Sequence, residues 1–116
     1  MYRVVICEDD GVLAADVGAL VEEAGHEVAG IFASARQALA VIARCDAQVA
    51  IIDLGLADGD TGAEVARVAA SLGMRVIILS GSSNVGHGLG ATSYTYAQKP
   101  WGQSVIRHLL SAHSTG

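Results

Sequence analysis

The most informative stretch of the sequence is Val49-Ala50-Ile51-Ile52-Asp53, four apolar residues that end abruptly in a carboxylate. A continuous apolar run of this length is typical of a strand buried on both faces, as in a parallel sheet. A second run of the same design, Arg3-Val4-Val5-Ile6-Cys7, is followed by Glu8-Asp9-Asp10. Open α/β sheets bind ligands at the carboxyl ends of their strands. The two runs therefore predict a pocket where these three acids meet Asp53.

Size and composition favour one compact domain over residues 1–116, with no output domain. The hydrophobic fraction of 52% and the charged fraction of 16% argue against disorder. The net charge of −5 disfavours direct nucleic-acid binding. No apolar run reaches about 18 residues, so no membrane insertion is expected. Cys7 and Cys45 lack metal-ligand spacing and indicate reduced thiols in a cytoplasmic protein, with Cys7 as a buried structural thiol.

Hydrophobic periodicity predicts strands that alternate with helices. Strands are expected at 3–7, 27–32, 49–53, 74–79 and 94–98, and helices at 11–24, 35–43, 61–72 and 103–112. Ser34 and Thr61 are the expected N-caps, and Glu64 would complete a capping box with Thr61. The segment 81–93 holds four glycines, so a fourth helix there is expected to be short, irregular or missing. The alternation predicts a doubly wound α/β fold with helices on both faces of a parallel sheet.

Polar side chains that follow the predicted strands have a chemical logic in common. They are Glu8, Asp9, Asp10, Asp53, Ser80 and Lys99. A carboxylate can act as the nucleophile that forms an aspartyl phosphate. Oxygen ligands favour Mg²⁺ or Mn²⁺, which neutralises the incoming phosphoryl oxygens. A lysine and a hydroxyl can hold those oxygens, so the set points to phosphoryl transfer.

The chain resembles the receiver domain of two-component response regulators over essentially its whole length. The acidic pair of that family matches Glu8-Asp9, and its phosphoacceptor matches Asp53 in IIDLGL. Its hydroxyl switch residue matches Ser80 in ILSG, and its lysine before a proline matches Lys99-Pro100. Its aromatic switch residue, three positions before the lysine, matches Tyr96.

The resemblance implies a flavodoxin-like, five-stranded parallel sheet in the order 2-1-3-4-5. It also implies that a sensor histidine kinase or a histidine phosphotransfer protein phosphorylates the chain in a Mg²⁺-dependent (or Mn²⁺-dependent) reaction. The implied roles are phosphorylation at Asp53; metal binding by Asp9, Asp53, the backbone carbonyl of Gly55 and, through water, Glu8; phosphoryl binding by Ser80 and Lys99; and switching by Ser80 and Tyr96.

Three departures from the family pattern stand out. Ala57 occupies a position that is often proline, and Gly55 one that usually carries a side chain. The interval between Ser80 and Lys99 is short and glycine-rich. The family commonly binds its output partners through a face built from the fourth helix, the fifth strand and the fifth helix, so this face is expected to differ here. The expected protein is a stand-alone cytoplasmic receiver that switches an unidentified downstream protein partner. It would catalyse only its own phosphorylation and slow dephosphorylation.

Two other functions remain open at this stage. A degenerate receiver would act only as a protein-interaction module, and the glycine-rich segment and Gly55 favour that alternative. A small phosphohydrolase would also work through an aspartyl phosphate. That function is disfavoured because Gly55 stands where such enzymes often have a second acid.

Overall fold

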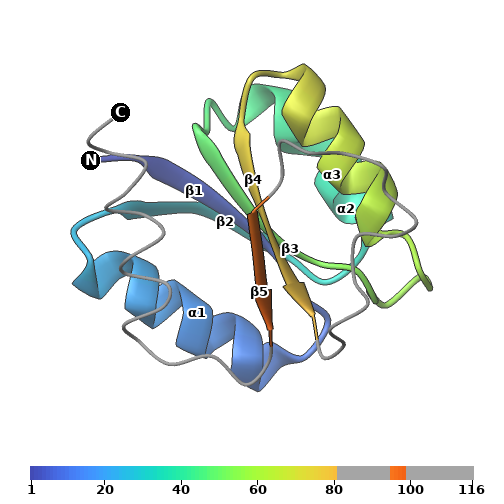
Figure 1. Cartoon of the computed structure of the whole chain (residues 1–116), viewed down its shortest axis with the longest axis horizontal. Coiled ribbons are helices and arrows are strands. Elements are labelled where there is room, and N and C mark those ends of the chain that lie inside the picture. Colours follow the sequence, from blue (N-terminus) through green and yellow to red (C-terminus); the bar gives the residue numbers. More distant parts are fainter. Residues whose placement is uncertain (81–94, 99–116) are drawn as a thin grey trace.

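The computed structural model describes residues 1–80 and 95–98, in which strands alternate with helices (Figure 1). The elements in chain order are β1 (Arg3–Cys7), α1 (Gly11–Glu23), β2 (Glu27–Phe32), α2 (Ala35–Val41), the 3-10 helix η1 (Ile42–Arg44), β3 (Val49–Asp53), α3 (Gly62–Ser71), β4 (Arg75–Ser80) and β5 (Thr95–Gln98). The strands pair in parallel in the order β2-β1-β3-β4-β5. This order confirms the predicted doubly wound, flavodoxin-like fold.

The strand register brings the carboxyl ends of β1 and β3 together. Cys7 pairs with Ile52, so Glu8 leaves β1 beside the point where Asp53 ends β3. On the other side of β3, Asp53 pairs with Leu79 of β4. The carboxylate of Asp53 therefore belongs to a strand with neighbours on both sides.

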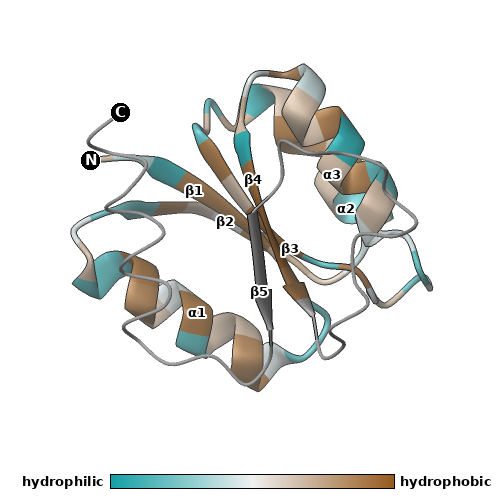
Figure 2. Ribbon diagram, in the orientation of Figure 1, coloured by the Kyte–Doolittle hydropathy of each residue, from teal (hydrophilic) through white to brown (hydrophobic). Residues whose placement is uncertain are grey.

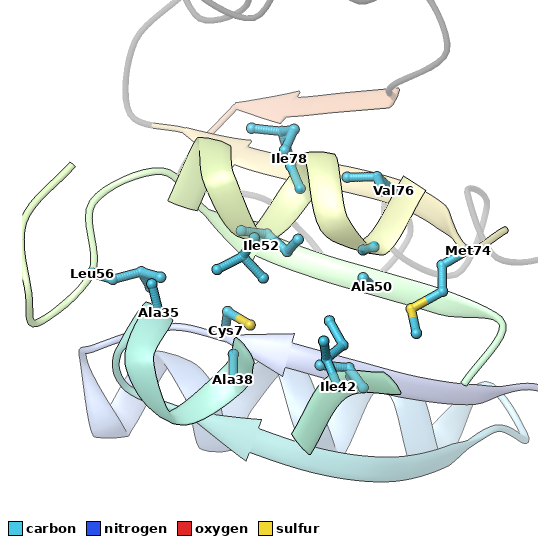
Figure 3. Packing of buried hydrophobic residues seen from close by; sticks show 14 residues of the cluster. Cys7, Ala35, Ala38, Ile42, Ala50, Ile52, Leu56, Met74, Val76 and Ile78 are labelled. Atoms are coloured by element: carbon cyan, nitrogen blue, oxygen red, sulfur yellow. The ribbon is translucent and has the colours of Figure 1, made fainter. Parts of the chain in front are cut away.

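Side chains of the central strands alternate between two apolar clusters, one on each face of the sheet. The cluster under α2 and α3 includes Cys7, Ile52 and Ile78 (Figure 3). The cluster under α1 takes the intervening residues, such as Ile6 and Ile51. Figure 2 shows hydrophobic colouring along much of β3 and β4 in the middle of the sheet. Burial on both faces is the reason that these strands appear in the sequence as unbroken apolar runs.

The N-termini of α2 and α3 are held in different ways. Ser34 caps α2 as predicted, because its hydroxyl oxygen accepts a hydrogen bond from the N–H of Gln37 at 3.1 Å. The capping box predicted for Thr61 and Glu64 is wrong, since the Thr61 side chain makes no capping bond. Its hydroxyl instead donates to Asp58 Oδ1 at 2.8 Å, so the side chain is directed to the loop before α3.

Two helices end at glycines in the left-handed backbone region. Gly25 follows α1 with a φ of +89°, and Gly73 follows α3 with a φ of +87°. Glycine adopts this conformation without the steric penalty of a Cβ atom. Helix α2 is shorter than predicted, because it ends at Val41 and continues as the η1 turn.

Several predicted features lie outside the described residues. They are the glycine-rich segment 81–93, Lys99 with the bend that follows it, and the last helix over 103–112. Within residues 1–80 and 95–98, no helix is long and apolar enough to cross a membrane.

Candidate functional site

Three acidic side chains meet at the carboxyl edge of the sheet. One carboxylate oxygen from each of Glu8, Asp9 and Asp53 lies within 4.8 Å of the other two. The parallel pairing of β1 and β3 causes this convergence, because Glu8 and Asp9 follow one strand and Asp53 ends the other. Crowded carboxylates repel one another unless a cation or a proton neutralises them. An all-oxygen donor set of this kind fits Mg²⁺ or Mn²⁺ better than Zn²⁺.

Asp10 does not belong to this three-acid cluster, and the prediction that it joins the pocket is wrong. Its side chain is the N-cap of α1, where Oδ1 accepts hydrogen bonds from Val12 N–H at 2.9 Å and Leu13 N–H at 3.2 Å. The first N–H groups of a helix have no partner within the helix, and the helix dipole favours a negative charge there. The third acid of the Glu8-Asp9-Asp10 run therefore serves as the N-cap of α1.

Glu8 forms the buried part of the cluster. Its exposed fraction is 2%, whereas Asp9 is exposed and Asp53 is half-buried. The Glu8 N–H donates to the Phe32 carbonyl at 2.9 Å, and Oε2 accepts from the Asp10 N–H at 3.2 Å. The hydrogen bond from Asp10 N–H offsets part of the cost of burying the Glu8 carboxylate. Glu8 is thus held in place from both β2 and the start of α1.

The loop after β3 donates a hydrogen bond to the carboxylate of Asp53. The N–H of Gly55 donates to Asp53 Oδ1 at 3.0 Å. Gly55 is exposed, and a Cβ added to it would meet no atom within 4 Å. The Gly55 carbonyl is the predicted third metal ligand. It belongs to a residue two positions after Asp53 whose surroundings are open.

Gly62, the first residue of α3, packs against the backbone of the central acid. A Cβ on Gly62 would overlap the Asp53 carbonyl oxygen and would lie 2.6 Å from Leu54 Cα. The Gly62 N–H also donates to the Leu54 carbonyl at 3.0 Å. Only glycine allows α3 to start this close to Asp53. Sequence reasoning missed this role, since a glycine at the first position of a helix has no distinctive pattern.

The remaining predicted site residues lie on or next to β4 and β5. Ser80 is the last residue of β4 and pairs with Gln98, the last described residue of β5. Tyr96 pairs with Ile78 within the same two strands. The backbone therefore ends β4 at the same edge of the sheet as Asp53, which ends its neighbour β3. Lys99, which would hold a phosphoryl oxygen, lies outside the described residues.

Cys7 precedes the acid cluster but takes no part in it. Its side chain is fully buried in the cluster under α2 and α3. Burial, with a smaller effect from Cys45, raises the pKa of the Cys7 thiol to about 12. The thiol therefore stays protonated and unreactive at neutral pH, which confirms the prediction of a buried structural thiol.

Comparison with known protein families gives one match that covers most of the chain. Residues 4–111 match the response regulator receiver domain. The chain therefore belongs to the receiver-domain family of response regulators, in agreement with the strand order and the acid cluster. No curated protein matches the chain.

Solved structures of receiver domains share this fold. The receiver domain of PhyR from Erythrobacter litoralis superposes with a TM-score of 0.88 and 24% identity, over 98% of this chain and 90% of that one. A CheY-like receiver domain protein from Methanospirillum hungatei has a TM-score of 0.84 and 26% identity, over 97% of this chain and 93% of that one. PhyR from Brucella abortus has a TM-score of 0.83 and 26% identity, over 95% of this chain but only 46% of its own.

Proposed function

We propose that Asp53 accepts a phosphoryl group from the phosphohistidine of a sensor histidine kinase or a histidine phosphotransfer protein. A carboxylate oxygen of Asp53 attacks phosphorus, and the nitrogen–phosphorus bond of the donor breaks. The electron pair remains on the imidazole nitrogen, which then takes up a proton from water. Water slowly hydrolyses the resulting acyl phosphate, so the chain turns over no separate substrate.

The observation that supports this proposal most strongly is the convergence of Glu8, Asp9 and Asp53 within 4.8 Å. Asp9, Asp53 and the Gly55 carbonyl would hold a Mg²⁺ ion directly, and Glu8 would hold it through water. When bound, the ion supplies positive charge against the phosphoryl oxygens. Asp53 ends a buried strand that is paired on both sides, and this supports a fixed place for its carboxylate during attack.

Ser80 and Lys99 would hold the phosphoryl oxygens once the group is on Asp53. A shift of Ser80 toward the new charge, followed by Tyr96, would change the surface that a downstream protein partner recognises. Strand β4, which carries Ser80, and strand β5, which carries Tyr96, lie on the same side of β3 in the sheet. We also propose that the protein acts in the cytoplasm, because the phosphodonors assigned to it are the kinases of two-component systems.

The direct test is to incubate the protein with acetyl phosphate, with Mg²⁺ or with EDTA. Intact-mass spectrometry is expected to show one added phosphoryl group only when Mg²⁺ is present. Borohydride reduces an acyl phosphate to homoserine, which should then appear at position 53 in the peptide map. An unmodified protein in Mg²⁺, or a phosphoryl group on another residue, would contradict the proposal.

A paired substitution tests the metal ligands. We expect Asp9→Asn to weaken Mg²⁺ binding by roughly tenfold or more, because a direct ligand loses its charge. Asp10→Asn is the matched control: it makes the same change one residue later, and asparagine is as good an N-cap as aspartate. Its Mg²⁺ affinity should stay within about twofold of the wild type, a shift well below that expected for a lost ligand. Titration calorimetry measures both, and equal losses would refute the assignment of Asp9.

A further inference from the structure

Asp58, in the loop after the central acid, connects three segments of the chain. Its Oδ1 accepts hydrogen bonds from Ala35 N–H at 2.9 Å and from the Thr61 hydroxyl at 2.8 Å. Its Oδ2 accepts from Arg36 N–H at 3.1 Å. One carboxylate thus ties the β3–α3 loop to the first residues of α2 and to the residue before α3. The Ala35 N–H and the Thr61 hydroxyl are the main reasons that the pKa of Asp58 falls to about 2.

Other contacts fix the same loop on the same side. Leu56 is buried in the cluster under α2 and α3, and Leu56 and Gly59 exchange backbone hydrogen bonds at 2.8 and 3.0 Å. Ala57 N–H donates to the Ala33 carbonyl at 2.9 Å, next to the start of α2. Gly55 lies between this anchored turn and Asp53, and its own position has open space around it. The place of the Gly55 carbonyl therefore depends on how firmly the turn is held.

We propose that Asp58 is a positioning residue for the cation site. By holding the loop against α2, its carboxylate fixes the Gly55 carbonyl where it serves as a ligand. This inference rests on the proposed function, which assigns that carbonyl to Mg²⁺. A loop already held in its bound conformation loses little conformational freedom when the ion arrives, whereas a loose loop must be ordered at the expense of affinity.

The competing explanation is that Asp58 only stabilises the start of α2. Ser34 separates the two roles, because it also caps α2, through Gln37 N–H, but makes no described hydrogen bond to the β3–α3 loop. Ser34→Ala therefore weakens the same helix end and leaves the loop attached. Asp58→Ala removes the helix contacts and the side-chain attachment of the loop together, and leaves the backbone hydrogen bond from Ala57 N–H to the Ala33 carbonyl in place.

The experiment measures Mg²⁺ affinity by titration calorimetry and stability by urea denaturation for both variants and the wild type. We expect Asp58→Ala to weaken Mg²⁺ binding about tenfold, as the loss of a group supporting a ligand does. Ser34→Ala should lose stability and keep its Mg²⁺ affinity within about twofold, since it removes no support from a ligand. Asp58→Asn, which can still accept at Oδ1 from Ala35 and Thr61, should recover most of the affinity.

The outcomes separate this inference from the proposed function. If the wild type binds Mg²⁺ and Asp58→Ala binds it equally well, the positioning role is wrong while the proposed function stands. Equal losses of affinity in Asp58→Ala and Ser34→Ala would show a helix-capping role only. If the wild type itself binds no Mg²⁺, the proposed function fails first. Should Asp58→Ala not fold, Thr61→Val takes its place, because valine lacks the hydroxyl that donates to Asp58 Oδ1. A measurable loss of Mg²⁺ affinity is then expected, and wild-type affinity in Thr61→Val would overturn the proposal.

Discussion

Phosphorylation by acetyl phosphate is expected to disappear when Asp53 is replaced by asparagine. A neutral amide oxygen lacks the charge and nucleophilicity that an attack on phosphorus requires. The fold should survive, because the Oδ1 of asparagine can still accept the hydrogen bond from Gly55 N–H. Intact-mass spectrometry in Mg²⁺ measures the loss, and thermal unfolding confirms that the variant is folded.

Asp60→Asn is the matched control for that experiment. Asp60 is an exposed acid in the same loop and is absent from the three-acid cluster. The substitution changes the net charge by the same amount, so its phosphorylation rate should remain close to that of the wild type. Persistent modification of Asp53→Asn, or a comparable loss in Asp60→Asn, would show that another carboxylate carries the phosphoryl group.

Gly62→Ala is expected to destabilise the protein by about 3 kcal/mol, the upper part of the range for overpacking. The new Cβ would lie 2.6 Å from Leu54 Cα and would overlap the Asp53 carbonyl oxygen, and backbone atoms cannot move aside as a side chain can. Either α3 shifts away from the sheet or the end of β3 moves. Urea denaturation should show a lower midpoint, and the folded fraction should be phosphorylated more slowly because Asp53 has been displaced.

Gly11→Ala provides the comparison. Gly11 is also the first residue of its helix, but a Cβ there would meet no atom within 4 Å. The same chemical change should therefore alter the free energy of unfolding by only about 0.5 kcal/mol. If both variants unfold at the same urea concentration, the close packing of α3 on Asp53 has no energetic consequence.

The fold could be predicted because its strands are buried on both faces. The central strand begins and ends at the predicted residues, Val49 and Asp53. The convergence of Glu8 and Asp9 on Asp53 followed from the same pattern, since neighbouring parallel strands end at one edge of the sheet. These features depend only on periodicity and on topology.

Features that depend on competition between nearby groups could not be predicted. Three acids follow β1, and the sequence does not show that the third, Asp10, caps α1. The hydroxyl of Thr61 had two candidate partners, and the structure pairs it with Asp58. The partners of Asp58 at the start of α2 are 22 and 23 residues away in the chain, so no local sequence pattern predicts them. Such choices are settled by tertiary packing.

The pairing of β1 with β3 has a consequence for the lifetime of the protein. These strands are neighbours in space, but α1, β2 and α2 separate them along the chain. A cation shared by their terminal acids would cross-link the two distant segments, so unfolding would require its release. A bound magnesium ion would then raise the resistance of the folded chain to proteases.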